Sequence, residues 1–313
     1  MRQVIIRRLL TALPTALFGS VLIFLLVHII PGGVAETLAG PEASPEMVAV
    51  INEQLGLNRP LHEQYFDWLG KAVQGNFGHS LLDNRDIGQG IADRFPLTME
   101  LAAIALFISL LVGVPLGVLS AVKRHTAVDS AVTSVSGLGL ALPEFWIAML
   151  AVNLLALRYT IFPATGIVPI SEDFWGHVNS MVMPSLTLAT GATAAITRFT
   201  RSGMIDALNS NYIRTAWALG LPARQVLFSF ALRNALIPVI TVVGIVAGSL
   251  IGGAVLVEEV FVIPGVGALL VTGVLQKDFP TVQGVALVLT VAVIVINLTV
   301  DLTCAAIDPR TRR

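Results

Sequence analysis

The sequence has little of what a soluble enzyme or a disulfide-stabilised secreted domain needs. Its 313 residues include one cysteine, Cys304, which excludes an intramolecular disulfide and gives no metal-ligand spacing. Only 12% of the residues are charged, whereas a soluble globular domain carries about 25%. The formal net charge of −1 argues against a nucleic-acid partner. Because 55% of the residues are hydrophobic, we expect an all-α integral membrane protein.

Six apolar segments have the length, or nearly the length, of a membrane-spanning helix. A helix needs about 20 residues to cross the roughly 30 Å hydrocarbon layer. The segments are residues 9–30, 101–122, 131–157, 182–197, 235–257 and 282–306. The fourth is the shortest because Arg198 and Arg201 end it. The first is longer than the apolar part of a typical signal peptide and is followed by no clear cleavage site, so we expect it to be retained.

The positions of lysine and arginine predict the orientation. Six spans place both termini on one side, and basic residues concentrate in cytoplasmic loops. The side with the termini contains Arg2, Arg7, Arg8, Lys123, Arg124, Arg198, Arg201, Arg214, Arg224, Arg233, Arg310, Arg312 and Arg313. The opposite side contains Arg59, Lys71, Arg85, Arg94, Arg158 and Lys277. Both termini are therefore predicted to be cytoplasmic.

This topology divides the chain into four parts. They are a first helix with its cytoplasmic end (1–30), a large external loop (31–96), a transmembrane core (97–308) with a cytoplasmic loop at 198–234, and a cytoplasmic tail (309–313). Within the external loop, residues 45–55 and 61–72 have apolar positions at helical spacing. We therefore expect the external loop to be an ordered element.

The cytoplasmic segment 211–238 has the pattern of two short helices joined at a bend. Ile213, Trp217 and Leu221 are four residues apart and would form one apolar stripe. Gly220 supplies a flexible stop, and Pro222 suits the first turn of a second helix. Such an element either offers a protrusion for another protein to grip or rests on the lipid headgroups. The residues alone leave both readings open.

The same segment resembles the conserved cytoplasmic loop of ABC importer permeases, written Glu-Ala-Ala, three residues, Gly, nine residues, Ile-x-Leu-Pro. Here Arg214-Thr215-Ala216 stands at the triplet and Gly220 at the glycine. Arg214 replaces the acidic residue, and Arg233 stands where the proline would be. Both departures are typical of the dipeptide/oligopeptide/nickel branch, whose string resembles Arg-Thr-Ala…Gly…Leu-Arg-Asn-Ala-Leu-Ile-Pro. Strings such as Leu142-Pro-Glu-Phe-Trp146 and Val257-Glu-Glu-Val-Phe261 extend the resemblance over nearly the full chain.

The resemblance implies a type I ABC importer permease fold in the bacterial cytoplasmic (inner) membrane. It implies as partners a second homologous permease subunit, two ATP-binding subunits and an external or periplasmic substrate-binding protein. The implied cargo is peptide, either di- and oligopeptides or glutathione-like compounds, with nickel or a metal chelate as the alternative. The implied contacts that couple this chain to the ATP-binding subunits are Arg214, Thr215, Ala216, Gly220 and Leu221.

The chain has no nucleotide-binding motif of its own. In its one Gly-Lys pair, Gly70-Lys71, Tyr65 stands where a Gly-x4-Gly-Lys-Ser/Thr motif needs its first glycine. We therefore expect a non-catalytic subunit with no cofactor or metal, and ATP and Mg²⁺ in the partner subunits. The alternative of a different class is an ion-coupled secondary transporter. Such a protein would need several intramembrane carboxylates and two halves related by inverted symmetry, and the sequence shows neither. A protease within the bilayer would need a serine–histidine or paired-aspartate arrangement, and His28 is the only histidine in a predicted span.

Glu144 is the ionisable residue nearest the middle of a predicted span. A carboxylate there is costly and marks a functional hypothesis. It either lines the translocation path and meets a substrate amine, or it sits just beyond a bend at Pro143, near an aqueous vestibule or a partner chain.

Other polar and small residues in the spans predict helix contacts. Gly113-x3-Gly117 and Gly248-x3-Gly252 have the spacing that allows close approach of two helices. Asn297 and Asp301, four residues apart, predict a polar stripe that faces protein, and His28 is expected at an interface.

Overall fold

The computed structural model describes residues 2–29, 35–36, 39–40, 44–54 and 56–307, and its regular elements in this part of the chain are helices. In chain order they are α1 Arg2–His28, α3 Pro45–Gln54, α4 Leu61–Val73, α5 Ile87–Val122, α6 Ala127–Ala141, α7 Glu144–Ala151, η1 Val152–Arg158, α8 Phe174–Leu208, α9 Asn211–Ala218, α10 Ala223–Gln225, η2 Val226–Leu232, α11 Arg233–Phe261, α12 Val266–Leu275 and α13 Phe279–Ile307. The elements η1 and η2 are π-helical.

Four helices of the described chain are long and apolar enough to cross a membrane. They are Arg8–His28, Ile87–Val122, Ala223–Phe261 and Phe279–Thr303. A fifth crossing results if α6 and the α7–η1 segment count as one, although they are bent by 100°. The predicted apolar segment 131–157 is therefore broken by a bend and is not one straight helix. Pro143 explains the break, since proline has no N–H to donate and favours extended backbone at the residue before it; Leu142 has ψ 130°.

The fourth predicted segment, 182–197, lies inside α8, which is 35 residues long. By composition α8 is not among the helices apolar enough to cross a membrane on their own. It is the central helix of the bundle and packs against α5, α6, α7 and α11. Hydroxyl-bearing side chains such as Ser180, Thr187 and Thr197 are thus buried by protein. A helix covered by its neighbours does not need a continuous apolar surface.

Glycines set the closest helix contacts. A Cβ on Gly113 would lie 3.0 Å from the Thr193 carbonyl oxygen, and one on Gly117 would lie 2.7 Å from that of Thr197. The first predicted glycine pair therefore packs α5 against α8. The second prediction is half wrong. A Cβ on Gly248 would lie 3.3 Å from Val293 of α13, but one on Gly252 would meet nothing within 4 Å.

The glycine that joins Gly248 at this contact is Gly244. A Cβ there would lie 2.8 Å from Val300 of α13. The small-x3-small pair that brings α11 and α13 together thus lies one turn earlier than predicted.

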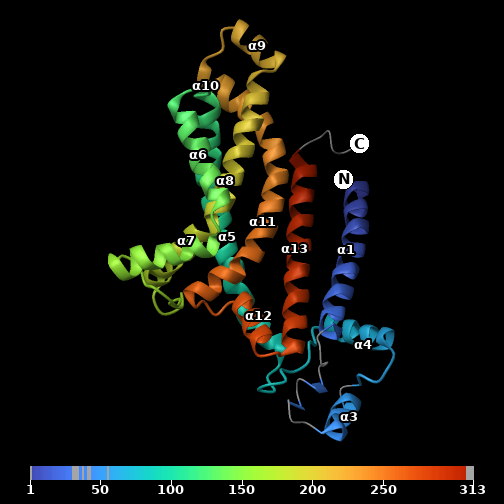
Figure 1. The fold of residues 1–313 in the computed structure, drawn as a ribbon. Helices are drawn as coiled ribbons and strands as arrows, with labels where there is room; N and C mark the ends of the chain where they lie inside the picture. Colours follow the sequence, from blue (N-terminus) through green and yellow to red (C-terminus); the bar gives the residue numbers. More distant parts are fainter. Residues whose placement is uncertain (1, 30–34, 37–38, 41–43, 55, 308–313) are drawn as a thin grey trace.

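The two ends of the bundle carry different elements. α3, α4 and α12 lie at one end, and α9 lies toward the other, with the start of α1 and the end of α13 (Figure 1). Arg8 of α1 pairs with Asp301 of α13 at 2.9 Å, which confirms that Asp301 faces protein. His28, at the other end of α1, lies 3.3 Å from the Gln64 side chain of α4, in agreement with an interface position.

The segment predicted as an external loop contains both expected helices, α3 and α4. It also contains the first residues of α5, which begins at Ile87. The Asp86 side chain caps this helix by accepting from the Gln89 backbone N–H at 2.7 Å. This extension was not predicted because Pro96 suggested a boundary, yet Pro96 lies within the helix.

Candidate functional site

Helix α9 protrudes at one end of the bundle and is anchored by one face. Ile213 and Ala216 are 1% and 4% exposed and pack into a cluster with Met204, Val226 and Ala231. Trp217, predicted to share the stripe of Ile213, is instead 47% exposed. The predicted stripe is therefore wrong: the buried face runs through positions 213 and 216, three apart, and Trp217 points away from the core.

The end of α9 is fixed by Gly220. Its φ of +73° lies in the left-handed region, which glycine adopts without steric cost. The Leu221 N–H donates to the Ala216 carbonyl at 3.3 Å, and the Gly220 N–H donates to the Trp217 carbonyl at 3.0 Å. This is a helix C-terminus closed by a left-handed glycine. The glycine is needed for its backbone conformation, since a Cβ at 220 would meet nothing within 4 Å.

The predicted second short helix is not a separate element. Pro222 precedes Ala223, and from there the helix continues without a break through α10 and η2 into α11, as one apolar helix of 39 residues, Ala223–Phe261. A π-helical turn fits one extra residue per turn and often occurs at functional sites. The segment 211–238 is thus one short helix, a glycine turn, and the extended beginning of a long apolar helix.

The outer surface of α9 combines aromatic, aliphatic and basic side chains. Tyr212, Trp217 and Leu219 are 42%, 47% and 74% exposed, and Arg214 and Thr215 are exposed beside them. Exposed aromatic and large aliphatic side chains, together with arginine, are typical of protein-binding surfaces. The sequence did not indicate Tyr212 or Leu219, because neither residue stands at a position of the conserved motif.

The five residues predicted as coupling contacts occupy different environments. Arg214 and Thr215 lie on the exposed face of α9, Gly220 lies at the exposed turn, and Leu221 is half-buried. Ala216 is buried in the chain's own core. Ala216 therefore positions α9, and its side chain is not available to another protein.

An ion pair ties three helices together at the same end. Arg201 of α8 donates from Nε and Nη2 to the two carboxylate oxygens of Asp129 in α6, at 2.7 and 2.8 Å. The Ser120 hydroxyl of α5 donates to the same carboxylate at 2.6 Å, as does the His125 backbone N–H at 3.1 Å. Two parallel contacts between a guanidinium and a carboxylate fix orientation as well as distance. The sequence had indicated Arg201 only as the end of a span.

The exposed side of α11 mixes polar, small and apolar residues. Its exposed positions recur at three and four residues and form the α11 stripe: Thr241, Ile245, Ser249, Gly252, Leu256 and Glu259. The exposed large side chains of α1 are Leu10, Leu13, Leu17, Phe18 and Leu26, with Thr11 and Thr15 beside them. Polar residues within a membrane commonly face protein or a water-filled cavity.

Glu144 is the first residue of α7, directly after the break at Pro143. Its half-buried carboxylate lies in a notch between α8 and α11. A Cβ on Gly253 would clash with this carboxylate, and one on Gly191 would lie 3.7 Å from it. Glycine at position 253 makes room for the acidic group, and a Cβ at 191 would be in ordinary contact with it. The predicted bend next to Glu144 is thus confirmed.

Comparison with known proteins identifies the family. Residues 113–313 match the family described as binding-protein-dependent transport system inner membrane component. Residues 1–102 match the N-terminal region of the membrane component of such systems. The chain belongs to this family. It is a membrane component of a transport system, as the resemblance of the segment 211–238 implied.

Relatives and solved structures agree with this assignment. The chain is 38% identical over 312 residues to the glutathione transport system permease protein GsiC of Escherichia coli (strain K12), a match that covers 100% of this chain and 99% of the relative. GsiC of Salmonella typhimurium (strain LT2) gives the same identity and coverage. A chain from inward-facing conformations of the MetNI methionine ABC transporter has a TM-score of 0.60 at 16% identity, covering 70% of this chain and 97% of that one. This inner membrane component therefore has the fold of an ABC transporter chain.

At the end opposite α9, this inner membrane component buries a second acidic side chain. Glu258 is 0% exposed. Its carboxylate accepts from the Thr98 hydroxyl of α5 at 2.5 Å and from the Ala268 backbone N–H of α12 at 3.0 Å. Thr98 in turn accepts from the Val266 N–H at 2.9 Å. The start of α12, where N–H groups lack partners within the helix, is therefore satisfied by side chains of α5 and α11.

Two glycines at the start of α12 belong to this arrangement. A Cβ on Gly265 or on Gly267 would clash with the Glu258 carboxylate. These glycines and Glu258 are thus parts of one structural unit that fixes α12 across the ends of α5 and α11.

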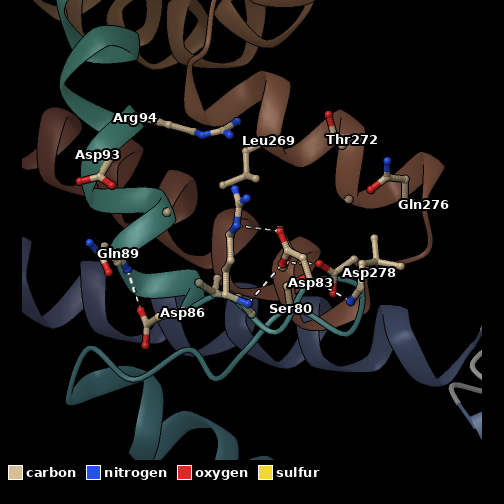
Figure 2. Close-up of a pocket in the computed structure, with 16 residues that line it drawn as sticks. Ser80, Asp83, Asp86, Gln89, Asp93, Arg94, Leu269, Thr272, Gln276 and Asp278 are labelled. Atoms are coloured by element: carbon tan, nitrogen blue, oxygen red, sulfur yellow. Dashed lines mark hydrogen bonds and ion pairs between the residues drawn. The ribbon is translucent and has the colours of Figure 1, made fainter.

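Beside α12 lies a cavity of about 730 Å³. Figure 2 shows residues of the segment before α5, of the first turns of α5 and of α12 around it. Its charged and amide side chains are Asp83, Arg85, Asp86, Gln89, Asp93, Arg94, Gln276 and Asp278. Asp278 accepts from the Leu81 N–H at 3.1 Å and so fastens the segment before α5 to the start of α13.

Asp83 illustrates how the rim of this cavity stays charged. The Arg85 backbone N–H and the Ser80 hydroxyl hydrogen-bond its carboxylate and hold its pKa below the usual value. The Arg85 side chain adds an ion pair at 3.2 Å. The rim is thus polar and of mixed sign, which suits recognition of a protein surface more than binding of an apolar ligand.

Proposed function

We propose that this chain is the permease subunit of an ATP-driven importer and forms half of the translocation pathway for glutathione-like compounds or short peptides. The observation that carries the proposal is the full-length identity of 38% to a glutathione transport system permease protein. The polar members of the α11 stripe, among them Ser249 and Glu259, support a transport path through the membrane, because polar side chains there commonly face protein or water. The alternative of an ion-coupled secondary transporter has no comparable support, because none of the relatives named above is a secondary transporter.

We propose six crossings, with both termini in the cytoplasm and the segment 31–86 outside. The sixth crossing is α8, which its neighbours shield from lipid. The orientation rests on the concentration of Lys and Arg in the loops on the side of α9. The location is the bacterial cytoplasmic (inner) membrane, in line with the family's description as an inner membrane component.

In this proposal α9 docks into a groove of an ATP-binding subunit. The contact is made by the exposed side chains of Tyr212, Arg214, Thr215, Trp217 and Leu219. Gly220 and Leu221 set the angle at which α9 leaves the membrane. ATP and Mg²⁺ belong to the two ATP-binding subunits, because this sequence contains no phosphate-binding motif.

Transport follows from a shift between two arrangements of the helices. ATP closes the two ATP-binding subunits, and their closure moves α9 of this chain and the corresponding loop of a second, homologous permease toward each other. A ligand shifts such an equilibrium only by its different affinity for the two states. The closed ATPase pair is that ligand, and the cavity beside α12 is the place where a substrate-loaded binding protein docks.

The test is reconstitution of the permease pair, the ATP-binding subunits and the binding protein into lipid vesicles. We expect radiolabelled glutathione to accumulate only with ATP and the loaded binding protein present, and to be unaffected by collapsing proton and sodium gradients. Uptake by this chain alone, driven by an ion gradient, would overturn the proposal. Uptake of Ni²⁺ in place of glutathione or a dipeptide would reassign the cargo and keep the permease role.

A further inference from the structure

The inference concerns the carboxylate of Glu144 and rests on the proposed function. Glu144 lies where two apolar segments of a membrane protein meet at a 100° bend. Its side chain reaches toward α8 and α11, where Gly253 leaves room for it and Gly191 borders it. At Gly253 the fit is so close that even a methyl group would clash with the carboxylate.

Within the described residues this carboxylate has no hydrogen-bond or ion-pair partner. The contrast with two buried acidic groups of the helices is clear. Glu258 accepts from Thr98 and Ala268, and Asp129 is held by Arg201. A carboxylate within a membrane is costly unless it is paired or hydrated. Glu144 is therefore given space by Gly253 and has no partner among the described residues of its own chain.

The notch adjoins the polar surface of α11. Gly253, which borders the carboxylate, is the neighbour of Gly252 on the α11 stripe, and Ser249 lies one turn away. Gly252 is exposed and would accept a Cβ without any contact within 4 Å. The carboxylate thus sits at the edge of the surface that best suits a water-filled path.

We propose that Glu144 binds the ammonium group of the substrate during its passage through the membrane. A primary ammonium is the cationic group that glutathione and peptides share, and it would form a charge-assisted hydrogen bond with the carboxylate. One carboxylate on one side of the path gives a contact that can form and break, as transport requires. The role is one of positioning a passing ligand, and no covalent step is involved.

The experiment uses the complete transporter in vesicles, with two matched pairs of variants. The first pair is Glu144→Gln, which keeps the size of the side chain and removes its charge, and Glu144→Asp, which keeps the charge. The second pair is Gly253→Ala, which displaces the carboxylate, and Gly252→Ala, which adds the same methyl group to open space. Initial uptake of radiolabelled glutathione and ATP hydrolysis stimulated by the loaded binding protein are measured together.

We expect Glu144→Gln and Gly253→Ala to lower uptake by about tenfold or more, the loss that follows removal of one charged hydrogen bond. Stimulated ATP hydrolysis should stay within about twofold of the unsubstituted complex, because the chemistry at the ATPase is untouched. Glu144→Asp should retain part of the uptake, and Gly252→Ala all of it. A purely structural role would instead lower uptake and ATP hydrolysis together, with a lower melting temperature.

Two outcomes would overturn the inference. One is unchanged uptake by Glu144→Gln. The other is loss of the second permease subunit when Glu144→Gln is purified, which would place the carboxylate in a contact between subunits. Absence of ATP-driven glutathione uptake by the unsubstituted complex would overturn the proposed function itself, and so the two failures are distinguishable.

Discussion

Arg201 holds Asp129 through two parallel contacts of 2.7 and 2.8 Å, and this pair joins the end of α8 to the start of α6. The two residues are separated by 72 positions in the sequence. Ser120 adds α5 to the same site. Because α9 follows α8 directly, the pair fixes the end of the bundle from which α9 protrudes.

The first prediction concerns this pair. Arg201→Ala should lower the melting temperature of the purified protein by a few degrees, since it leaves a carboxylate shielded from water without its counter-ion. Arg201→Lys should recover only part of the loss, because lysine cannot make two parallel contacts. Arg198→Ala, at an exposed position one turn earlier, is the control and should have no effect. Equal melting temperatures for the two alanine variants would contradict a stabilising role.

The second prediction concerns the exposed face of α9. Trp217→Ala should weaken binding of the ATP-binding subunits by about tenfold, as expected for an exposed aromatic at the centre of an interface. Phe228→Ala removes an aromatic side chain that is similarly exposed but lies beyond the turn, in η2, and should leave binding unchanged. The measurement is co-purification or surface-immobilised titration with the complex in detergent. If Phe228→Ala weakens binding and Trp217→Ala does not, the docking face is misplaced.

The third prediction concerns the glycine turn. Gly220→Ala should destabilise the turn by about 1 kcal/mol, because alanine resists a φ of +73°. Gly220→Pro should do more, since proline fixes φ near −65° and removes the N–H that reaches the Trp217 carbonyl. Gly70→Ala, in the helix α4 with open space around it, is the control and should be neutral or slightly stabilising. Coupled transport and proteolysis at the loop would report the difference.

The fourth prediction concerns the buried acid near α12. Glu258→Ala should destabilise the protein by about 1–3 kcal/mol, because the N–H of Ala268 and the hydroxyl of Thr98 lose their acceptor in a buried site. Glu259→Ala changes the adjacent, exposed acid and should have little effect. Hydrogen exchange should show faster exchange in α12 for the first variant alone. Unchanged protection of α12 would refute the capping role.

The fifth prediction concerns pH. His177 lies at the start of α8, before the segment 182–197, with its ring nitrogens 2.9 Å from the Glu100 carboxylate and 2.7 Å from the Val168 carbonyl oxygen. Burial of the imidazole lowers its pKa, but the hydrogen bonds to Glu100 and Val168 raise it and prevail, so that the folded-state pKa is above the ordinary value.

Because the pKa of His177 is raised on folding, protonated His177 stabilises the folded state. This stabilisation is fully present at pH values below the unfolded-state pKa of about 6.5, and it is lost as the pH rises through the folded-state pKa. His177→Gln should therefore flatten the dependence of melting temperature on pH above about 6.5. His62→Gln, at an exposed position of α4, is the control. An identical pH dependence in the two variants would exclude His177 as the source.

The sequence predicted most helix positions, because the apolar segments and their breaks depend on nearby residues. Pro143 predicted the bend, Gly220 predicted the end of α9, and the helical spacing of apolar residues predicted α3 and α4. The continuation of the helix from Ala223 into α11 was missed, because Pro222 marks a helix start but says nothing of where that helix ends.

The faces and partners of these helices could not be predicted in the same way. Both sides of α9 carry large apolar residues, so a stripe of three positions could not decide between Ala216 and Trp217 as the buried one. The contacts Arg201–Asp129 and Glu258–Thr98 join residues 72 and 160 positions apart, and only the packing of the whole bundle brings them together. The same holds for Gly244, whose role depends on Val300 of another helix.

The helix Ala223–Phe261 begins at the glycine turn beside α9 and ends at the residues that fasten α12. With 39 residues it is close to 60 Å long at about 1.5 Å per residue. In the proposed assembly it acts as a single lever between the ATP-binding subunits and α12, with the π-helical turn of η2 near one end as the place where it can bend. If so, a tilt applied at the α9 end displaces Glu258 and α12, and a fluorophore at Gln276 should register ATP binding.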